Sequence, residues 1–271
     1  MFLASCGGEQ KVEKVEEPNP KAQAIEEMSE DDMAKADAMI KNMPSPIEMA
    51  ILVKHAGGEY NPSLLNDIKK IDDYVTNGKK TINMGVYSAD VGYTSLYKQT
   101  QETVFYLNGV RQLSDGIGLT DAFEQSIFDR VEANIEVRDS LLVILSNAYD
   151  IANAYLKEND RMNTSALMIA GGWIESVYLA ANLGSKEDGT EDIIALRILE
   201  QEVVLGKIIK TMRLIESDPL VDEFADKLED LSTVLVELKV KIGEGEHASV
   251  DEEKMKEVVK KINEIRAWAV A

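Results

Sequence analysis

The sequence predicts an all-α protein, either an antiparallel helical bundle or an irregular array of about eight helices. Composition favours helix over sheet, because only 6% of residues are aromatic and 6 of the 271 residues are prolines. Apolar residues also recur three and four positions apart over long stretches, which is the period of an amphipathic helix. No stretch of useful length alternates apolar and polar residues as a strand would.

Eight segments carry this helical period, and signals that start or stop a helix bound most of them. The expected helices span roughly 45–55, 61–77, 80–115, 120–157, 162–183, 190–216, 219–242 and 249–268. N-caps are expected at Ser45, Asp218 and Ser249, each followed by a proline or by a capping-box glutamate. The last two helices should form an antiparallel hairpin.

The chain is expected to divide into a tether and a helical body. Residues 1–5 read as the remainder of a signal peptide, and 6–44 as an acidic tether of low hydrophobicity. The helical domain is expected over 45–271, with a possible subdivision near 184–190, where a glycine-bounded loop interrupts the helical pattern.

The stretch Leu3-Ala4-Ser5-Cys6 resembles a bacterial lipobox, in which an apolar residue and two small residues precede a cysteine that becomes lipidated. Only Met1 and Phe2 precede it, so the start site lies upstream or the leader has been trimmed. The resemblance implies an acylated Cys6 and stable membrane anchoring. Glycine rather than aspartate follows the cysteine, which implies an outer-membrane protein facing the periplasm or the cell surface. The alternative is an incidental cysteine in a cytosolic protein.

The net charge is −20 at pH 7. A surface this acidic repels phosphate backbones, so we expect no nucleic-acid partner. Anionic lipid head groups would repel it as well, so we expect contact with a membrane through the lipid anchor only. The charge is sufficient to keep the protein soluble, and a basic partner or divalent cations are alternative explanations for it.

The stretch 83–101 reads as helix, yet it contains two glycines, Gly85 and Gly92. They belong to a small-residue face that would let a second helix approach more closely than the usual separation of about 8–10 Å between axes. A second face collects polar groups at steps of three and four: Asn83, Tyr87, Asp90, Thr94, Tyr97 and Gln101. We expect this face to be turned inward, because tyrosine prefers a half-buried position with its hydroxyl bonded.

The predicted helix 162–183 has a similar character, with Gly171 and Gly172 preceding Trp173. We expect these two helices to face each other and to bring Asp90 near Glu175. Two buried acids require a cation. Arg138 is the first candidate because it interrupts the apolar face of its own helix, and the alternatives are Arg197 and Arg111.

Two interpretations of this region stay open. In one, it is a buried network of hydrogen-bonded polar groups that fixes the register of the helices. In the other, the same residues line a pocket for a polar or cationic small ligand. Both interpretations involve one set of residues: Tyr87, Asp90, Tyr93, Tyr97, Gln101, Arg138, Trp173, Glu175 and Tyr178.

We expect no metal site and no cofactor. The chain has 2 histidines, which is too few for most hydrolytic or metal machinery. The Glu-x-x-His spacing at 244–247 lies in a glycine turn, and the second copy that a di-iron bundle needs is absent from the sequence. There is no phosphate-binding glycine loop and no nucleophile elbow.

The segment Asn83–Asp90 resembles one in helical lipoproteins of unknown function from Gram-negative bacteria, a resemblance that implies no activity. With the lipobox, it leads us to expect a lipid-anchored, non-catalytic protein that binds a protein partner or a small polar ligand. A structural or scaffold lipoprotein with no pocket is the alternative. A third hypothesis is an enzyme that uses Asp90 or Glu175 as an acid or base.

Overall fold

The computed structural model describes residues 59–123, 125–183, 190–215, 217–238, 240–242 and 248–271. The expected leader, tether and first helix, with Cys6, lie outside these residues, as does most of the expected subdivision at 184–190.

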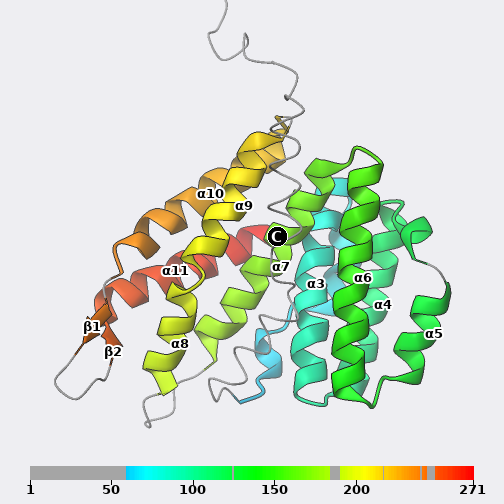
Figure 1. The fold of residues 1–271 in the computed structure, drawn as a ribbon, viewed down its shortest axis with the longest axis horizontal. Helices are drawn as coiled ribbons and strands as arrows, with labels where there is room; N and C mark the ends of the chain where they lie inside the picture. The colour runs from blue at the N-terminus through cyan, green and yellow to red at the C-terminus, as the bar shows by residue number, and fades with distance from the viewer. Residues whose placement is uncertain (1–58, 124, 184–189, 216, 239, 243–247) are drawn as a thin grey trace, which may run out of the picture.

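Within the described residues, the prediction of an all-α fold is confirmed (Figure 1). The nine α-helices there are α3 (Asn77–Leu96), α4 (Thr100–Gly116), α5 (Gln125–Ala133), α6 (Arg138–Glu158), α7 (Met162–Asn182), α8 (Thr190–Leu199), α9 (Glu202–Leu214), α10 (Pro219–Val236) and α11 (Glu252–Ala269). Three short 3-10 helices accompany them: η1 (Pro62–Leu64), η2 (Ile68–Asp73) and η3 (Thr120–Ala122). One antiparallel ribbon lies between α10 and α11, made of β1 (Val240–Ile242) and β2 (Ala248–Val250).

The helices form two groups that meet at α7. Figure 1 shows α3, α4, α5 and α6 on one side of the molecule and α8, α9, α10 and α11 on the other. Helix α7 lies between them and contacts α3 and α6 in the first group and all four helices of the second. The C-terminal end of α11 returns to the middle of the molecule, where α11 contacts both α7 and α3.

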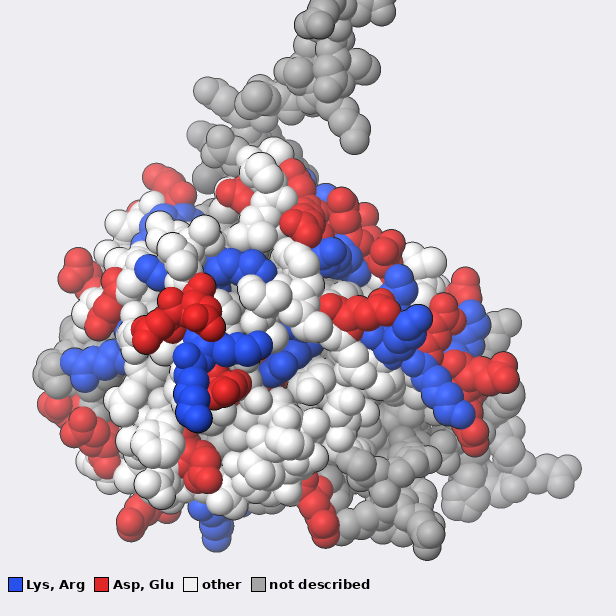
Figure 2. Space-filling view, turned by 180° about the vertical axis from the view of Figure 1, so that it is seen from behind, with Lys and Arg blue, Asp and Glu red and all other residues white. Residues whose placement is uncertain are grey.

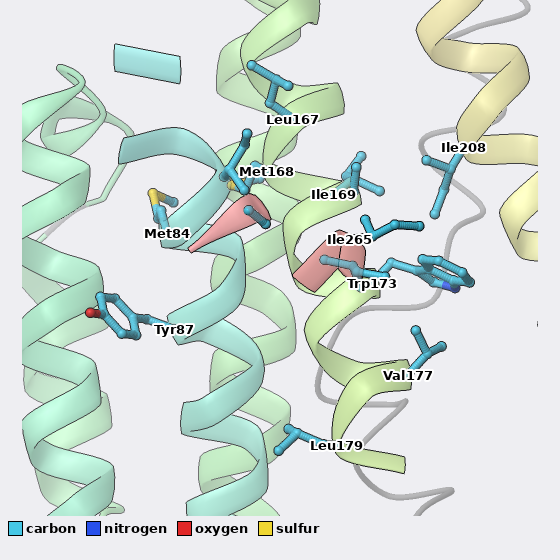
Figure 3. Packing of buried hydrophobic residues seen from close by; sticks show 14 of the residues in the cluster. Met84, Tyr87, Leu167, Met168, Ile169, Trp173, Val177, Leu179, Ile208 and Ile265 are labelled. Carbon is cyan, nitrogen blue, oxygen red and sulfur yellow. The ribbon is translucent and has the colours of Figure 1, made fainter. Parts of the chain in front are cut away.

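One apolar core runs through both groups, because α7 is buried on almost every side. Residues 165–177 of this helix are all buried, as expected for a helix that is apolar around its whole circumference. Figure 3 shows Trp173 beside Ile208 of α9 and Ile265 of α11, while Met84 and Tyr87 of α3 lie on the other side. The two groups are therefore packed on opposite faces of the same helix.

Three of the predicted helices are each divided into shorter elements. The predicted helix 80–115 ends at Leu96 and restarts at Thr100, because Lys98 adopts a left-handed conformation with a φ of 60°. The amide of Gln99 closes this turn by donating to the carbonyl oxygen of Thr94 at 2.9 Å. In the same way, 120–157 divides into η3, α5 and α6, and 190–216 divides into α8 and α9. None of these turns is marked in the sequence by glycine or proline.

The predicted helix at 61–77 is wrong. This segment forms η1 and η2 with extended residues between them. Helix α3 begins where the predicted helix was expected to end, at Asn77. The hydroxyl of Thr76 caps it by accepting a hydrogen bond from the amide of Lys79 at 3.2 Å.

The expected cap at Asp218 is confirmed, since its carboxylate accepts hydrogen bonds from the amides of Leu220 at 2.9 Å and Val221 at 3.1 Å. The expected cap at Ser249 is wrong. Ser249 lies in β2, and Asp251 caps α11 instead.

Acidic and basic side chains are interspersed on the face shown in Figure 2. Surface ion pairs accompany this mixture, and Arg213, for example, pairs with Asp222, Asp226 and Glu229. Exposed pairs of this kind contribute little stability. Among the described helices, none combines the length and the apolar character needed to cross a membrane.

Candidate functional site

The contact between α3 and α7 is so close that a methyl group does not fit into it. A Cβ atom added at Gly85 would lie 2.1 Å from the carbonyl oxygen of Met168. A Cβ atom added at Gly171 would lie 2.2 Å from the carbonyl oxygen of Ile82. The two backbones therefore touch directly, and the prediction that these helices face each other through their glycines is confirmed at both positions.

This contact buries two carboxyl groups close to each other. Asp90 of α3 and Glu175 of α7 are both 0% exposed. Arg266 of α11 binds Glu175 through two hydrogen bonds, with Nε donating to Oε2 at 2.9 Å and Nη2 donating to Oε1 at 3.1 Å. The ring of Tyr178 stacks on the guanidinium group, 4.6 Å from its central carbon. Two parallel bonds and a stacked ring are the strongest form of arginine–carboxylate pair.

Asp90 faces Glu175, and within the described part of the chain the donor to its other oxygen is a backbone amide. Its Oδ2 atom accepts a hydrogen bond from the amide of Asn66 at 3.2 Å. Burial raises the pKa of Asp90 well above its ordinary value, and the charge of Glu175 raises it further, while Arg266 opposes the shift. The Oδ1 atom of Asp90 has no hydrogen-bond partner among the described residues, so we assign a proton to this atom, from which it can be donated to the Glu175 carboxylate.

Burial also raises the pKa of Glu175. Arg266 and the hydrogen bond from Asp90 act in the opposite direction and favour the charged form of the Glu175 carboxylate. With Asp90 neutral, the three side chains carry no net charge, so the cost of burying them is much reduced.

Asn66 connects this acid pair to the segment that covers α3. Its side-chain amide donates to the hydroxyl of Tyr74 at 3.0 Å and to Oδ1 of Asn83 at 3.3 Å. Its carbonyl oxygen accepts a hydrogen bond from the hydroxyl of Tyr106 at 2.9 Å. Asn83 in turn donates to the carbonyl oxygen of Ala269 at 3.0 Å. The network therefore ties residues 59–74 to α3, α4 and the end of α11.

The tyrosines of α3 use their hydroxyls on the backbone of the same segment. Tyr87 donates to the carbonyl oxygen of Asp67 at 3.0 Å, and the hydroxyl of Tyr93 accepts from the amide of Asn61 at 2.8 Å. The rings of Tyr93 and Tyr97 lie 5.0 Å apart. Burial is the main cause that raises the pKa of Tyr97 to about 12. The inward orientation predicted for this face is observed at these positions.

Arg138 is not the cation of this site, and the prediction that it partners the two acids is wrong. Its guanidinium group pairs with Asp139 at 2.7 Å at the start of α6. The cation is Arg266, whose side chain is 14% exposed. The signal that points to it is its position on the same helical face as the buried Ile262, four residues earlier.

Two further residues of the predicted set lie elsewhere. Gln101 is exposed on α4, because the turn at Lys98 rotates the chain before α4 begins. Trp173 is 4% exposed but lies on the side of α7 that faces Ile208 (Figure 3). The structure therefore brings Tyr87, Asp90, Tyr93, Tyr97, Glu175 and Tyr178 to one region and places Gln101, Arg138 and Trp173 outside it.

These contacts favour the interpretation as a buried network. Tyr87, Asp90, Tyr93 and Glu175 are each 0% exposed, and each takes part in a hydrogen bond. An acid or base must reach a proton of its substrate. The geometry therefore gives no support to an enzymatic role for Asp90 or Glu175.

A separate site lies between α4, α5 and α6, where the structure has a cleft of about 250 Å³. Its wall is mostly apolar and includes Leu107 and Val110 of α4, Ile127 and Val131 of α5, and Leu145 of α6. Four polar residues complete the lining: Asn108, Arg111, Ser114 and Glu132. Apolar walls with a few convergent polar groups are typical of small-molecule sites.

A smaller cavity of about 60 Å³ adjoins the inner side of this cleft. Leu107, Val110 and Leu145 line both spaces. The smaller cavity extends toward α3, where Met84 and Val91 form part of its wall. The two spaces therefore lie side by side and share part of their walls on α4 and α6.

The helices predicted from the sequence leave no room for this cleft. A single helix was expected over 120–157, and such a helix would have left no separate α5 to form an outer wall. The consecutive apolar residues Val104 and Phe105 were a usable signal in the sequence, and in the structure they are 39% and 51% exposed, with Val104 lining the cleft. A helix with an apolar face beyond the one that packs on the core often borders a binding site.

Comparison with known proteins finds no relative: no protein-family model, no curated protein and no solved structure matches this chain. Among the residues that the structure describes, there is no cluster of three or more His, Cys, Asp or Glu side chains suited to a metal ion. The fold and its sites thus define an all-α protein that contains a buried acid–arginine network and a separate apolar cleft.

Proposed function

We propose that this chain is a lipid-anchored, non-catalytic protein that binds a small, largely apolar ligand in the cleft between α4, α5 and α6. The observation that carries this proposal is the cleft itself, with its volume of about 250 Å³ and its predominantly apolar wall. Burial of apolar ligand surface in such a cleft supplies the driving force for binding, at about 25 cal/mol per Å² removed from water.

The proposed ligand differs from the polar ligand expected at the contact of α3 with α7. The polar groups of that contact are engaged with one another, as the paired Glu175 and Arg266 illustrate. A ligand there would have to replace hydrogen bonds that the protein already makes within itself. The cleft requires no such exchange for most of its wall.

Binding of an uncharged fluorescent probe, N-phenyl-1-naphthylamine, tests the proposal. Ala148→Phe adds a ring to the wall shared by the cleft and the smaller cavity. Because the ring occupies the space of the probe, the variant should show no rise in probe fluorescence. Val143→Phe is the matched control, because Val143 lies on the same helix and is 60% exposed. Thermal unfolding confirms that both variants fold. Equal binding by the two variants, or no binding by the folded wild-type protein, would overturn the proposal.

The lipid anchor is proposed from the lipobox that ends at Cys6, and with it a location at the outer membrane, facing the periplasm or the cell surface. Mass spectrometry of the N-terminal peptide from membranes should show acyl chains on this cysteine. Cys6→Ser should move the protein from the membrane fraction to the soluble fraction. A free thiol on protein that already fractionates as soluble would remove the anchor from the proposal.

A structural lipoprotein without a ligand is the second candidate, and the buried network is the observation that favours it. The hydrogen bonds of Asn66, Asn83 and Arg266 link several segments, and a rigid spacer would require such links. A folded protein that takes up no apolar probe would favour this candidate.

A further inference from the structure

The polar residues that line the cleft between α4, α5 and α6 differ in their access to water. Asn108 and Arg111 of α4 and Glu132 of α5 are exposed. Ser114, near the C-terminal end of α4, is 2% exposed. Water can therefore hydrate the first three residues whether or not a ligand is present. The surroundings of Ser114 depend instead on the protein and on the molecule that occupies the cleft.

The hydroxyl group of Ser114 has no hydrogen-bond partner among the residues that the structure describes. Other hydroxyl groups on the helices donate to the carbonyl oxygen four residues earlier, as Thr103 of the same helix does at 2.9 Å and Ser88 and Ser176 do at 2.7 Å. Ser114 does not make this bond. A buried hydroxyl without a partner is unfavourable, so a ligand atom that accepts its proton would bind more tightly.

The charged residues of the lining do not favour an ionic ligand. Arg111 already has an interaction within the protein, so its charge is not free for a ligand. Glu132 is a carboxylate and the whole chain carries a net charge of −20, so an anion would be repelled. A cationic group at Ser114 would be removed from water, and a single hydroxyl oxygen would have to accept its several hydrogen bonds. An uncharged group is transferred from water at much lower cost.

From these observations we infer that the cleft binds an uncharged, largely apolar molecule with one hydrogen-bonding oxygen, such as a phenol or an alcohol, and that Ser114 selects it. This inference rests on the proposed binding function of the cleft and specifies the class of its ligand. The Ser114 hydroxyl donates to the ligand oxygen, while apolar residues such as Val110 and Leu145 contact the rest of the molecule.

Displacement of N-phenyl-1-naphthylamine by four para-substituted butylbenzenes tests the inference. Para-butylphenol and para-butyltoluene share the ring and the chain, and they differ by a hydroxyl group in place of a methyl group. Para-butylbenzoate and para-butylbenzylammonium carry a negative and a positive charge at the same position. The full chain carries Cys6→Ser, so that no acyl group requires a detergent that would compete for the cleft. The affinity of each variant for the probe is measured first, so that all displacement values refer to one scale.

In the wild-type protein, para-butylphenol should displace the probe at a lower concentration than either ion. Ser114→Ala should weaken binding of para-butylphenol about threefold to tenfold and leave that of para-butyltoluene unchanged. Comparing the two ligands in the two proteins isolates the hydrogen bond, because the difference in hydrophobicity between the ligands cancels. Ser95→Ala is the matched control, because Ser95 is 5% exposed and its hydroxyl also lacks a partner among the described residues, but it does not line the cleft. Thermal unfolding verifies that both variants fold.

The outcomes distinguish failure of the inference from failure of the proposed function. The inferred class of ligand is wrong, and the binding function stands, if Ser114→Ala changes the affinities for para-butylphenol and para-butyltoluene equally or behaves like Ser95→Ala. The same conclusion follows if either ion displaces the probe at a lower concentration than para-butylphenol. If neither the probe nor any of these compounds binds the folded protein, the binding function itself fails.

Discussion

Replacing Asp90 with asparagine tests whether this carboxyl group is protonated in the folded protein. One oxygen of Asp90 accepts a hydrogen bond from the amide of Asn66, and the other faces Glu175. In Asp90→Asn, the amide oxygen keeps the first bond, and the amide NH₂ donates to the Glu175 carboxylate as the acid proton does in the wild type. The substitution therefore imitates the protonated acid and removes its titration.

The expected effect has a definite sign. The pKa of Asp90 is raised in the folded state above its ordinary value of 3.8, so between these two values the folded protein binds one proton more than the unfolded chain. The contribution of Asp90 to stability is thus fully present below this window and is lost as the pH rises through it, at about 1.4 kcal/mol for each pH unit. The Asp90→Asn variant has no titrating group at this position, so it does not lose this stability as the pH rises. The stability advantage of the variant over the wild type should therefore grow at the same rate across this window.

Urea unfolding followed by circular dichroism between about pH 4 and pH 8 gives the free energy of unfolding of both proteins. The two should be similarly stable near the acid end, and the variant should be the more stable one at neutral pH. Glu175→Gln is a contrast of opposite sign, because it leaves the Arg266 guanidinium group without its carboxylate and should cost about 3–5 kcal/mol at neutral pH. A difference between wild type and Asp90→Asn that does not change with pH would refute the assignment of a proton to Asp90.

Other predictions follow from the helix contacts and caps. Gly85→Ala and Gly171→Ala should each lower the free energy of unfolding by about 1–3 kcal/mol or more, because the added Cβ atom meets backbone of the partner helix. Gly206→Ala in α9 should raise it by about 1 kcal/mol, since among the described residues no atom outside the neighbouring backbone of α9 lies within 4 Å of the added methyl group. If thermal unfolding shows the same effect at Gly85 and Gly206, the close contact is wrong. Asp218→Ala should cost about 1 kcal/mol through the loss of two capping hydrogen bonds, and an unchanged melting temperature would contradict that role.

The contact of α3 with α7 could be predicted because its cause is local. Glycines at helical spacing are unfavourable unless something approaches them closely, so Gly85 and Gly171 indicate a neighbour even in an isolated sequence. Polar residues on the same helices, such as Asp90, are therefore expected in the protein interior as well. Position along a single helix was sufficient for this reasoning.

The cation of the network could not be predicted in the same way. Arg266 is separated from Glu175 by 91 positions in the chain, and their pairing depends on how α11 returns to α7. Arg138 was a reasonable candidate by its place on an apolar face. Its helix, however, begins at that residue, so its side chain lies at a helix end beside Asp139. The wrong prediction of where this helix begins therefore led to the wrong cation for Asp90 and Glu175.

The same kind of error concealed the cleft. Helices α5 and α6 share one continuous apolar period, and the turn at residues 134–137 contains no glycine or proline. The conformation of such a turn depends on the tertiary contacts around it, which local propensity does not contain. Because α5 and α6 are separate helices, their apolar residues do not pack along a single helix. Some of them line the space between α5 and its neighbours instead.

The network and the smaller cavity beside the cleft are connected through α3, and this gives the two adjoining spaces walls of unequal rigidity. Asp90 and Gly85 hold one side of α3 against α7, while Met84 and Val91 of the same helix line the smaller cavity. The inner wall is therefore fixed by the most tightly packed contact of the fold. The outer wall is α5, which packs mainly on α6 and is joined to it by a short turn. A ligand of the wrong width can be accommodated only by displacement of α5, because movement of α3 would break the backbone contact with α7 and the hydrogen bonds of the network together. The position of α3 thus fixes one wall of the smaller cavity, and the packing of α5 on α6 sets the width of the cleft.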